Sequence, residues 1–305
     1  MTIPNSVTEI GMLAFSGCSG LTSISVANDN PNFDSRNNCN AIIETKTNSL
    51  IVGCKNTIIP NSVTKIGVGA FYGCSSLTKV TIPNSVTEIG ESAFAGCSVT
   101  QVNIPKSVTK IGAGAFGSCS GLTSISVAND NPNYDSRNNC NAIIETETNT
   151  LIAGCKNTII LNSIIKIGNS AFVGCSDLIQ VKIPNSVTEI GADAFARCSG
   201  LTQVNIPNSV TKIGDSAFAR CSGMTQVNIS NSVTKIGDHA FADCSGLTQV
   251  NIPNSVTEIG ILAFSGCRGL TQVTVPKWLA DNKSFMESVF PDFKGTVKVN
   301  SYSNE

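Results

Sequence analysis

Residues 206–227 read IPNSVTKIGDSAFARCSGMTQV, and this stretch recurs with few changes along most of the chain. Its first isoleucine returns every 23 residues from Ile160 onward, and a fixed period of this length is the signature of a repeat solenoid. The copies begin at Ile3, Ile59, Ile82, Ile104, Ile160, Ile183, Ile206, Ile229 and Ile252, with Val275 as a degenerate last member. We therefore expect one long stack of similar units, because each repeat of a solenoid packs on its neighbours.

The first half of each unit has the pattern of a short strand. Val204 and Ile206 alternate with Gln203 and Asn205, and this period of two marks a strand that is buried on one face. Pro207 follows directly and has no backbone N–H to donate, so the strand ends there. Stacked units would place these strands side by side, about 4.8 Å apart, in one parallel sheet.

The second half of each unit has the pattern of a short extended arm and a helical turn. The arm ends at Ile213 and Gly214, and Asp215 or Ser216 can cap the helical turn that follows. The apolar residues of that turn share one face and are Ala217, Phe218 and Cys221. We therefore expect an α/β repeat solenoid with a parallel β-sheet on one face and short helical turns on the opposite face.

Two steps of the repeat measure 56 residues instead of 23, because similar inserts lie at residues 27–58 and 128–159. Each insert holds two short apolar runs around a polar stretch, a pattern that predicts a β-hairpin. Pairing of Ile43 with Leu50 would give the first hairpin a single apolar face. The residues of that face would be Cys39, Ala41, Ile43, Leu50, Val52 and Cys54.

The C-terminal residues 277–305 depart from the repeat and are rich in aromatic side chains. Apolar residues have helical spacing between Asp281 and Phe290, and residues 295–299 could add a last strand. The C-terminal end of a solenoid needs a cap that covers its last unit. We therefore expect a solenoid domain over residues 1–276 and a cap over residues 277–305.

The composition argues against several classes of protein. Charged residues make up 13% of the chain, against about 25% in an ordinary soluble domain. The net charge is −1 and no Lys/Arg run occurs, so a nucleic-acid partner is not expected. No apolar run is long enough to span a bilayer, so membrane insertion is not expected. Met1 leads into the middle of a repeat without a signal peptide, and we expect that the chain was cut from a longer one.

Thirteen cysteines raise the question of disulfides or metal binding. Nine of them stand at one repeat position, three residues after a phenylalanine: Cys18, Cys74, Cys97, Cys119, Cys175, Cys198, Cys221, Cys244 and Cys267. We expect these to be buried free thiols, because parallel side chains of a ladder suit disulfide geometry poorly. The insert pairs Cys39/Cys54 and Cys140/Cys155 could face each other across a hairpin, and a disulfide there remains open.

No catalytic, cofactor or metal site is expected from the sequence. His239 is the only histidine, and a zinc site or a catalytic group would need several partners beside it. The glycines belong to the repeat and form no phosphate-binding loop. A cluster with the spacing of a calcium loop lacks the required glycine and the last acidic ligand, so Asx turns explain it better: Asn28, Asn30, Asn32 and Asp34.

A charged position precedes the Ile-Gly pair of each unit. Its residues often differ in sign between neighbouring units: Glu9, Lys65, Glu88, Lys110, Lys166, Glu189, Lys212, Lys235 and Glu258. Exposed ion pairs contribute about 0–1 kcal/mol each, so this ladder predicts a solvated and mildly stabilised edge.

The outward strand positions remain as the candidate binding surface. They are polar and align from unit to unit: Gln180, Lys182, Gln203, Asn205, Gln226, Asn228, Gln249, Asn251 and Gln272. Solenoids often bind partners through such extended faces. The alternative is that these amides only satisfy one another along the sheet.

The unit at residues 198–218, C-x-x-L-x-x-V-x-I-P-x-x-V-x-x-I-G-x-x-A-F, resembles the BspA-like class of leucine-rich repeats, which occurs in bacterial and protist surface antigens. The resemblance covers about nine units. It implies a right-handed solenoid, a cell-surface or secreted location, and binding of host matrix or plasma proteins, or of other cells. The family motif defines the scaffold and assigns no ligand residue.

We therefore expect a non-enzymatic recognition or adhesion module that binds a protein or glycan through its polar strand face. The alternative is a structural spacer that displays other domains of a longer chain. The sequence indicates neither the ligand nor the oligomeric state.

Overall fold

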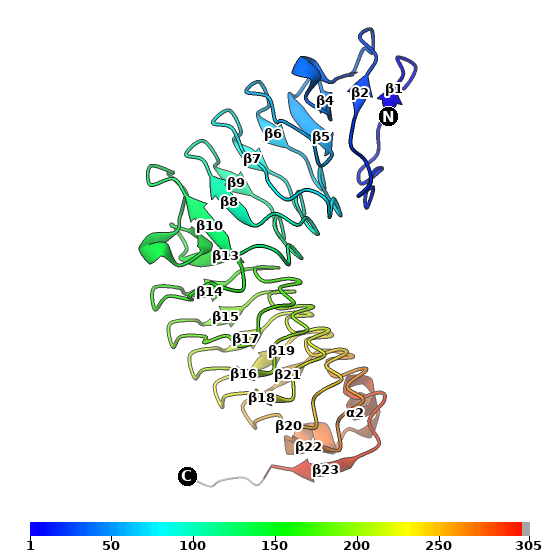
Figure 1. Cartoon of the computed structure of the whole chain (residues 1–305). Coiled ribbons are helices and arrows are strands. Elements are labelled where there is room, and N and C mark those ends of the chain that lie inside the picture. The colour runs from blue at the N-terminus through cyan, green and yellow to red at the C-terminus, as the bar shows by residue number, and fades with distance from the viewer. Residues whose placement is uncertain (301–305) are drawn as a thin grey trace. The chain divides into compact units, whose positions relative to one another are not determined.

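The structure, a computed structural model, describes residues 1–300 (Figure 1). These residues fall into two compact units. Unit 1 holds residues 1–147 and 152–158, and unit 2 holds residues 148–151 and 159 onward. Each unit is a stack of similar coils of chain, which we call rungs, and each rung is one copy of the sequence repeat.

Unit 1 contains one large sheet and several small ones. The large sheet has the order β3 (Phe33–Asp34), β4 (Ala41–Glu44), β5 (Ser49–Gly53), β6 (Lys65–Ile66), β7 (Glu88–Ile89) and β9 (Lys110–Ile111). The small sheets pair β1 (Thr2–Ile3) with β2 (Ser25–Val26) and β8 (Gln101–Ile104) with β10 (Ser124–Val127). In addition, β11 (Tyr134–Asp135) pairs antiparallel with β12 (Ala142–Glu145), and both belong to an eight-stranded sheet. Short 3₁₀ turns are η1 (Arg36–Asn38) and η2 (Arg137–Asn139).

Unit 2 repeats two strands per rung, both parallel to their counterparts. One set is β13 (Thr150–Gly154), which pairs through Thr150 and Leu151, β14 (Lys166–Ile167), β15 (Glu189–Ile190), β17 (Lys212–Ile213), β19 (Lys235–Ile236) and β21 (Glu258–Ile259). The other set is β16 (Gln203–Asn205), β18 (Gln226–Asn228), β20 (Gln249–Asn251), β22 (Gln272–Val275) and β23 (Thr296–Val299). The helices are α1 (Lys277–Ala280) and α2 (Lys283–Val289).

The expected helical turns are not confirmed, because this part of each rung forms irregular turns in the described chain. The amide of Ala219 donates to Ser216 of its own rung at 2.9 Å, whereas the amide of Phe218 donates to Ala240 of the next rung at 2.8 Å. Ser216 has a φ of 53°, which a right-handed helix does not allow. Hydrogen bonds between rungs therefore replace the helical pattern that the apolar spacing favoured.

The Ile-Gly pair of the repeat is explained by the close approach of neighbouring rungs. A Cβ added to Gly214 would lie 2.6 Å from the backbone nitrogen of Ala192 in the preceding rung. Real side chains do not tolerate such a contact, so glycine is required here for space. The second strand of each rung can then pair closely with the next, as Lys212 does with Lys235.

Buried phenylalanine rings form a stack in each unit. In unit 1 the ring of Phe94 lies 5.0 Å from that of Phe71 and 5.4 Å from that of Phe116. In unit 2 neighbouring ring centroids lie 4.9–5.3 Å apart along Phe172, Phe195, Phe218, Phe241, Phe264 and Phe290. Such offset contacts between rings add to the hydrophobic stabilisation of the core.

The C-terminal residues pack against the last rung of unit 2. Phe290 of the tail stacks on Phe264 at 4.9 Å, and the carbonyl of Val289 accepts a hydrogen bond from the amide of Phe264 at 3.0 Å. The Asn282 side chain accepts a bond from the amide of Phe285 and caps α2. Strand β23 then pairs with β22. The boundary at residue 276 stays a prediction, and residues 301–305 of the proposed cap lie outside the described chain.

The first insert forms the expected hairpin, with Ile43 opposite Leu50. The prediction that all its apolar residues share one face was wrong. The register shifts between Ile42 and Ile43, so that Ile42 lies opposite Val52. Val52 and Cys54 therefore join a cluster with Ile42 and Phe33, while Cys39 packs in the separate cluster of Ile43 and Leu50. This β-bulge places Cys39 and Cys54 on different faces, and all thirteen cysteines are free.

Candidate functional site

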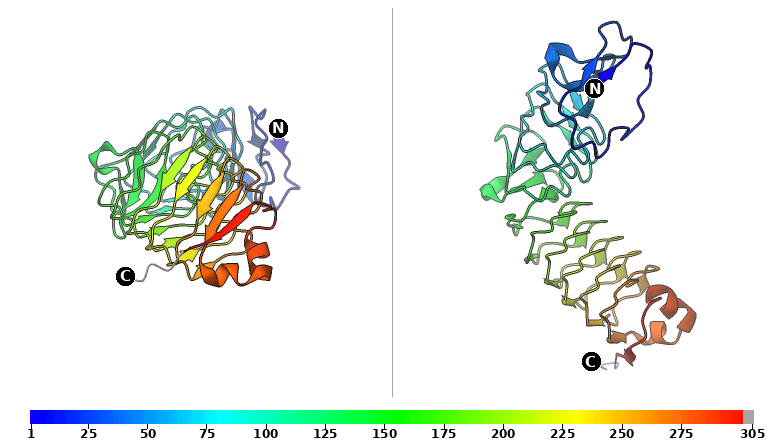
Figure 2. Two further views of the ribbon diagram at one scale, coloured as in Figure 1. Left: turned by 90° about the horizontal axis from the view of Figure 1, so that it is seen from below. Right: turned by 45° about the vertical axis from the view of Figure 1, so that its right-hand side comes forward.

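The candidate binding residues all lie in unit 2, and we call them the amide strip: Gln180, Lys182, Gln203, Asn205, Gln226, Asn228, Gln249, Asn251 and Gln272. Parallel pairing brings equivalent side chains side by side. Gln203 pairs with Gln180 and Gln226, and Gln249 pairs with Gln272. Figure 2 (left) shows the strands of the strip next to one another, coloured from yellow-green to orange.

The alternation of each strand turns the amides outward. In β18, Val227 is buried in the core, whereas Gln226 and Asn228 on either side of it are exposed. The same exposed–buried–exposed pattern holds for β16 and β20. Gln272 is half-buried, because β23 packs beside its strand. The strip therefore presents two parallel rows of side chains, one mainly of Gln and one mainly of Asn.

A shallow groove of about 200 Å³ runs between the two rows. One wall consists of Gln226, Gln249 and Gln272, and the other of Asn228, Asn251 and Thr274. Because it crosses β18, β20 and β22, the groove follows the direction in which the rungs stack. A ligand in it would meet the same pair of side chains once in every rung.

Some of these side-chain amides donate hydrogen bonds to one another, which agrees with the alternative that they satisfy one another along the sheet. Gln226 Nε2 donates to Asn228 Oδ1 at 3.1 Å, and Asn228 Nδ2 donates to Asn205 Oδ1. No side-chain hydrogen bond within residues 1–300 involves Gln203 or Gln249. The same holds for Asn251 and Gln272 in this part of the chain. These carboxamides keep donors and acceptors for a ligand.

The other exposed strand set carries the predicted ion pairs. Glu189 accepts from Lys166 at 3.0 Å and from Lys212 at 3.1 Å, and Lys235 pairs with Glu258. Burial acts to raise the pKa of Glu189, but the hydrogen bonds from Lys166 and Lys212 outweigh it and hold that pKa below its usual value. The charged side chains of this edge therefore pair with one another. The amide strip differs, because Lys182 is its only charged residue.

The cysteine ladder consists of buried thiols in seven of its nine positions, as expected. Cys221 Sγ donates to the carbonyl of Phe195 at 3.1 Å, and the same bond recurs in neighbouring rungs. Burial raises the pKa of Cys119 to about 12, so its thiolate is not available as a nucleophile. Cys18 is an exception because it is exposed, and Cys175 is half-buried.

The remaining residues considered for metal binding or catalysis, the Asn/Asp cluster and His239, make structural contacts. Asn30 Oδ1 accepts from the amides of Asn32 and Phe33, which forms the expected Asx turn, and Asp34 is bound by Arg36. His239 is half-buried, and its amide donates to Ile261 of the next rung at 3.1 Å. Among residues 1–300, no group of three or more His, Cys, Asp or Glu side chains is placed to hold a metal ion.

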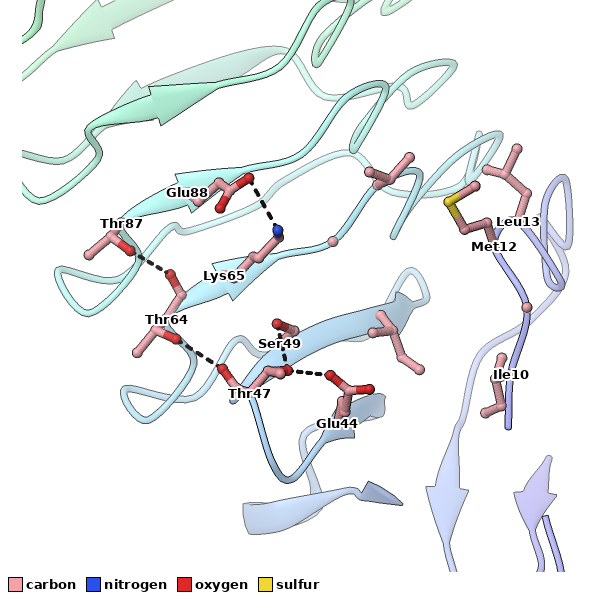
Figure 3. Close-up of a pocket in the computed structure, with 14 residues that line it drawn as sticks. Ile10, Met12, Leu13, Glu44, Thr47, Ser49, Thr64, Lys65, Thr87 and Glu88 are labelled. Carbon is pink, nitrogen blue, oxygen red and sulfur yellow. Dashed lines mark hydrogen bonds and ion pairs between the residues drawn. The ribbon is translucent and has the colours of Figure 1, made fainter. Parts of the chain in front are cut away.

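One concavity was not foreseen from the sequence. A pocket of about 490 Å³ lies in unit 1 on the outer face of β5, β6 and β7 (Figure 3). Ile10, Met12 and Leu13 of the first rung form one side, and Lys65 and Glu88 form an ion pair on the other. The signal in the sequence was Met12-Leu13, an apolar pair at the position where Asp215-Ser216 stands in an ordinary unit.

The part of the chain that the structure describes contains no helix of the length and apolarity needed to cross a bilayer. Among solved structures, a leucine rich cell surface protein from Faecalibacterium prausnitzii is similar to the chain. Its TM-score is 0.63 and its identity 27%, over 99% of this chain and 79% of that protein.

Two further structures share the fold at lower identity. The pneumococcal vaccine antigen PcpA has a TM-score of 0.58 and 20% identity, over 90% of this chain and 61% of that one. A leucine-rich repeat protein from Eubacterium ventriosum has a TM-score of 0.57 and 21% identity, over 88% of this chain and 77% of that one. No curated protein matches the chain.

A family model described as the BspA type leucine rich repeat region, in 6 copies, matches residues 1–49, 42–150 and 144–271. These segments contain the recurring Ile-Gly pair, the inward phenylalanine and the cysteine that the stacked rungs use. Since the match covers most of the repeats, the chain belongs to the BspA-type leucine-rich repeat proteins.

Proposed function

We propose that the chain is a non-enzymatic recognition module of a cell-surface or secreted protein, and that it binds its partner through the amide strip. The observation that carries this proposal is the alignment of exposed amides in consecutive rungs, with a groove between their two rows. The similar Faecalibacterium protein is described as a cell surface protein, which supports the proposed location.

The internal contacts of the stack support a binding role over a catalytic one. Ladder thiols such as Cys221 and Cys244 donate hydrogen bonds to carbonyls of neighbouring rungs. Burial also raises the pKa of the Cys267 thiol to about 12. An enzyme would need a nucleophile, a base and a group that orients them within reach of one another. The amides of the strip form an extended recognition surface instead, and solenoids use such surfaces for partners.

The proposal is tested by adding charge to the strip. The triple variant Gln203→Glu, Gln226→Glu and Gln249→Glu places three carboxylates in adjacent rungs, where they repel one another and lose the amide donors. Wild-type and variant chains are compared for binding to a panel of immobilised matrix proteins, plasma proteins and polysaccharides. We expect the variant to lose the binding that the wild type shows.

A matched control adds the same charge next to the other strand set, at the residue directly before β15, β17 and β19. Thr188→Glu, Thr211→Glu and Thr234→Glu alter exposed residues of neighbouring rungs away from the strip. We expect this control to bind like the wild type. Equal binding by the strip variant would show that the strip is not the binding face, and failure of the wild type to bind any panel member would favour the spacer alternative.

A further inference from the structure

The amide strip repeats with a fixed spacing, which restricts the kind of ligand that can use every rung. Phenylalanine rings in the same rungs follow one another at 5.1–5.3 Å, close to the spacing of about 4.8 Å between paired strands. The glutamine position is identical in five consecutive rungs of unit 2, at Gln180, Gln203, Gln226, Gln249 and Gln272. A linear ligand with the same repeat could make the same contacts in each rung.

An extended peptide does not match this spacing. Its residues advance by about 3.3 Å each, so a peptide lying along the groove would fall out of register with the side chains after one or two rungs. A peptide lying along a single strand would meet only one Gln and one Asn. The repeated array therefore favours a polymer whose repeating unit is longer than an amino-acid residue.

The chemistry of the strip favours a neutral, hydroxyl-rich polymer. Each carboxamide offers N–H donors and a carbonyl acceptor, and sugar hydroxyls both donate and accept. A polyanion such as a nucleic acid is held mainly by Lys and Arg, and Lys182 is the only such residue in the strip. The residues that line the groove are Gln, Asn, Thr and Val, and none of them is charged.

We infer that the amide strip binds a neutral, linear β-1,4-linked polysaccharide that lies in the groove and crosses the strands, an inference that rests on the proposed function. The equatorial linkages of such a chain keep it extended, and each sugar advances by nearly one rung spacing. Each sugar also carries equatorial oxygens on both edges of the ribbon. One edge then faces the row of Gln226 and Gln249, and the other faces the row of Asn228 and Asn251.

This arrangement predicts that affinity depends on chain length. The groove offers no aromatic platform, since its lining consists of Gln, Asn, Thr and Val, and each sugar contributes only a few hydrogen bonds. Contacts in successive rungs add once the first sugars are bound, because later contacts form at high effective concentration. Affinity should therefore rise with each added sugar until the chain spans the strip, and then level off.

The test measures binding of defined oligosaccharides by titration calorimetry. Cellohexaose and chitohexaose serve as β-1,4-linked probes, with cellobiose as the short probe and maltohexaose as an α-1,4-linked chain of the same length. We expect cellohexaose or chitohexaose to bind, cellobiose to bind at least about tenfold more weakly, and maltohexaose not to bind, because its chain coils away from the rungs.

Two variants separate the strip from other amides. Gln249→Ala with Asn251→Ala should weaken binding of the hexasaccharide about tenfold, the loss expected from one or two hydrogen bonds. Gln101→Ala with Asn103→Ala removes the same chemistry from β8 of unit 1, where the paired strand β10 carries Ser124 and Ser126 instead of amides, and should leave binding unchanged.

The possible failures are distinguishable. Equal binding of maltohexaose, or equal sensitivity of the two variants, would overturn the assignment of a register-matched glycan. Absence of binding by both β-1,4-linked probes would overturn the inference. If a protein from the panel then binds and the strip variant with three glutamates loses it, the proposed function stands without the glycan.

Discussion

Replacement of Phe218 by alanine tests whether the phenylalanine stack holds unit 2 together. The ring is 0% exposed and lies between Phe195 at 5.2 Å and Phe241 at 5.3 Å. Removing a buried phenylalanine side chain costs about 3–5 kcal/mol, and the neighbouring rings cannot close the gap because backbone bonds fix the distance between rungs. We expect Phe218→Ala to lower the free energy of unfolding by about 5 kcal/mol, at the upper end of this range.

The assay is urea unfolding followed by circular dichroism and by the fluorescence of Trp278, which lies in the cap of unit 2 and donates to the carbonyl of Val256 at 2.9 Å. Phe218→Leu keeps most of the buried apolar volume and should cost about 1–2 kcal/mol. Phe15→Ala is the matched control, because Phe15 holds the same repeat position but is half-buried. A loss below about 1 kcal/mol for Phe218→Ala, or one equal to that of Phe15→Ala, would refute the stacking argument.

Three further predictions use single side chains. In the native state Cys18 should react with a thiol reagent at pH 8 while Cys119 reacts only after denaturation, because burial raises the pKa of Cys119 to about 12; mass spectrometry of labelled peptides reads the result. Glu189→Gln should cost at most about 1 kcal/mol at pH 7. Because the folded-state pKa of Glu189 is lowered, this loss is full above the ordinary value of 4.5 and disappears as pH falls through the folded-state value, as unfolding at several pH values would show. Gly214→Ala should destabilise the chain by about 1–3 kcal/mol, whereas Gly20→Ala, with nothing within 4 Å of its added Cβ, should leave the unfolding midpoint unchanged.

The repeat period predicts the stacking register because it acts along the whole chain. A step of 23 residues places Gln203 beside Gln226, and the structure pairs these residues. The hairpin followed from two apolar runs around a polar stretch, and the structure has the pairing of Ile43 with Leu50 that the sequence analysis assumed. The β-bulge next to this pair could not be foreseen, since one extra residue changes the facing of Val52 without changing the composition of the strand.

The expected helical turns are not confirmed, and the physical reason is that the spacing within one unit carries no information about contacts between rungs. Ala217, Phe218 and Cys221 have helical spacing, but alternate amides bond to the following rung and positive φ values at Ser216 and Arg220 interrupt any helix. In this rung each such bond joins an amide to a carbonyl 22 positions further along the chain. A pattern confined to one unit contains no information about it.

The first rung shows how an insert alters its neighbours. In ordinary rungs the phenylalanine amide donates to the alanine of the next rung, as Phe71 does to Ala93 at 2.7 Å. In the first rung the amide of Gly53, in the inserted hairpin, donates to the carbonyl of Ala70 at 2.8 Å. By the pattern of the other rungs, this carbonyl would accept from the amide of Phe15. In this rung Cys18 is exposed, and the unforeseen pocket lies beside Met12.

Unit 1 provides an internal comparison for the residues of the amide strip. Its rungs carry Ser23, Lys79, Gln101 and Ser124 at the position that is glutamine in five rungs of unit 2. The stack therefore forms with a serine, a lysine or a glutamine at this position, and packing does not require the amide. The inward residues behave differently, because Phe and Cys recur in both units where their contacts are internal. The regularity of the glutamines in unit 2 is thus not explained by the scaffold, and a ligand that repeats with the rungs would explain it.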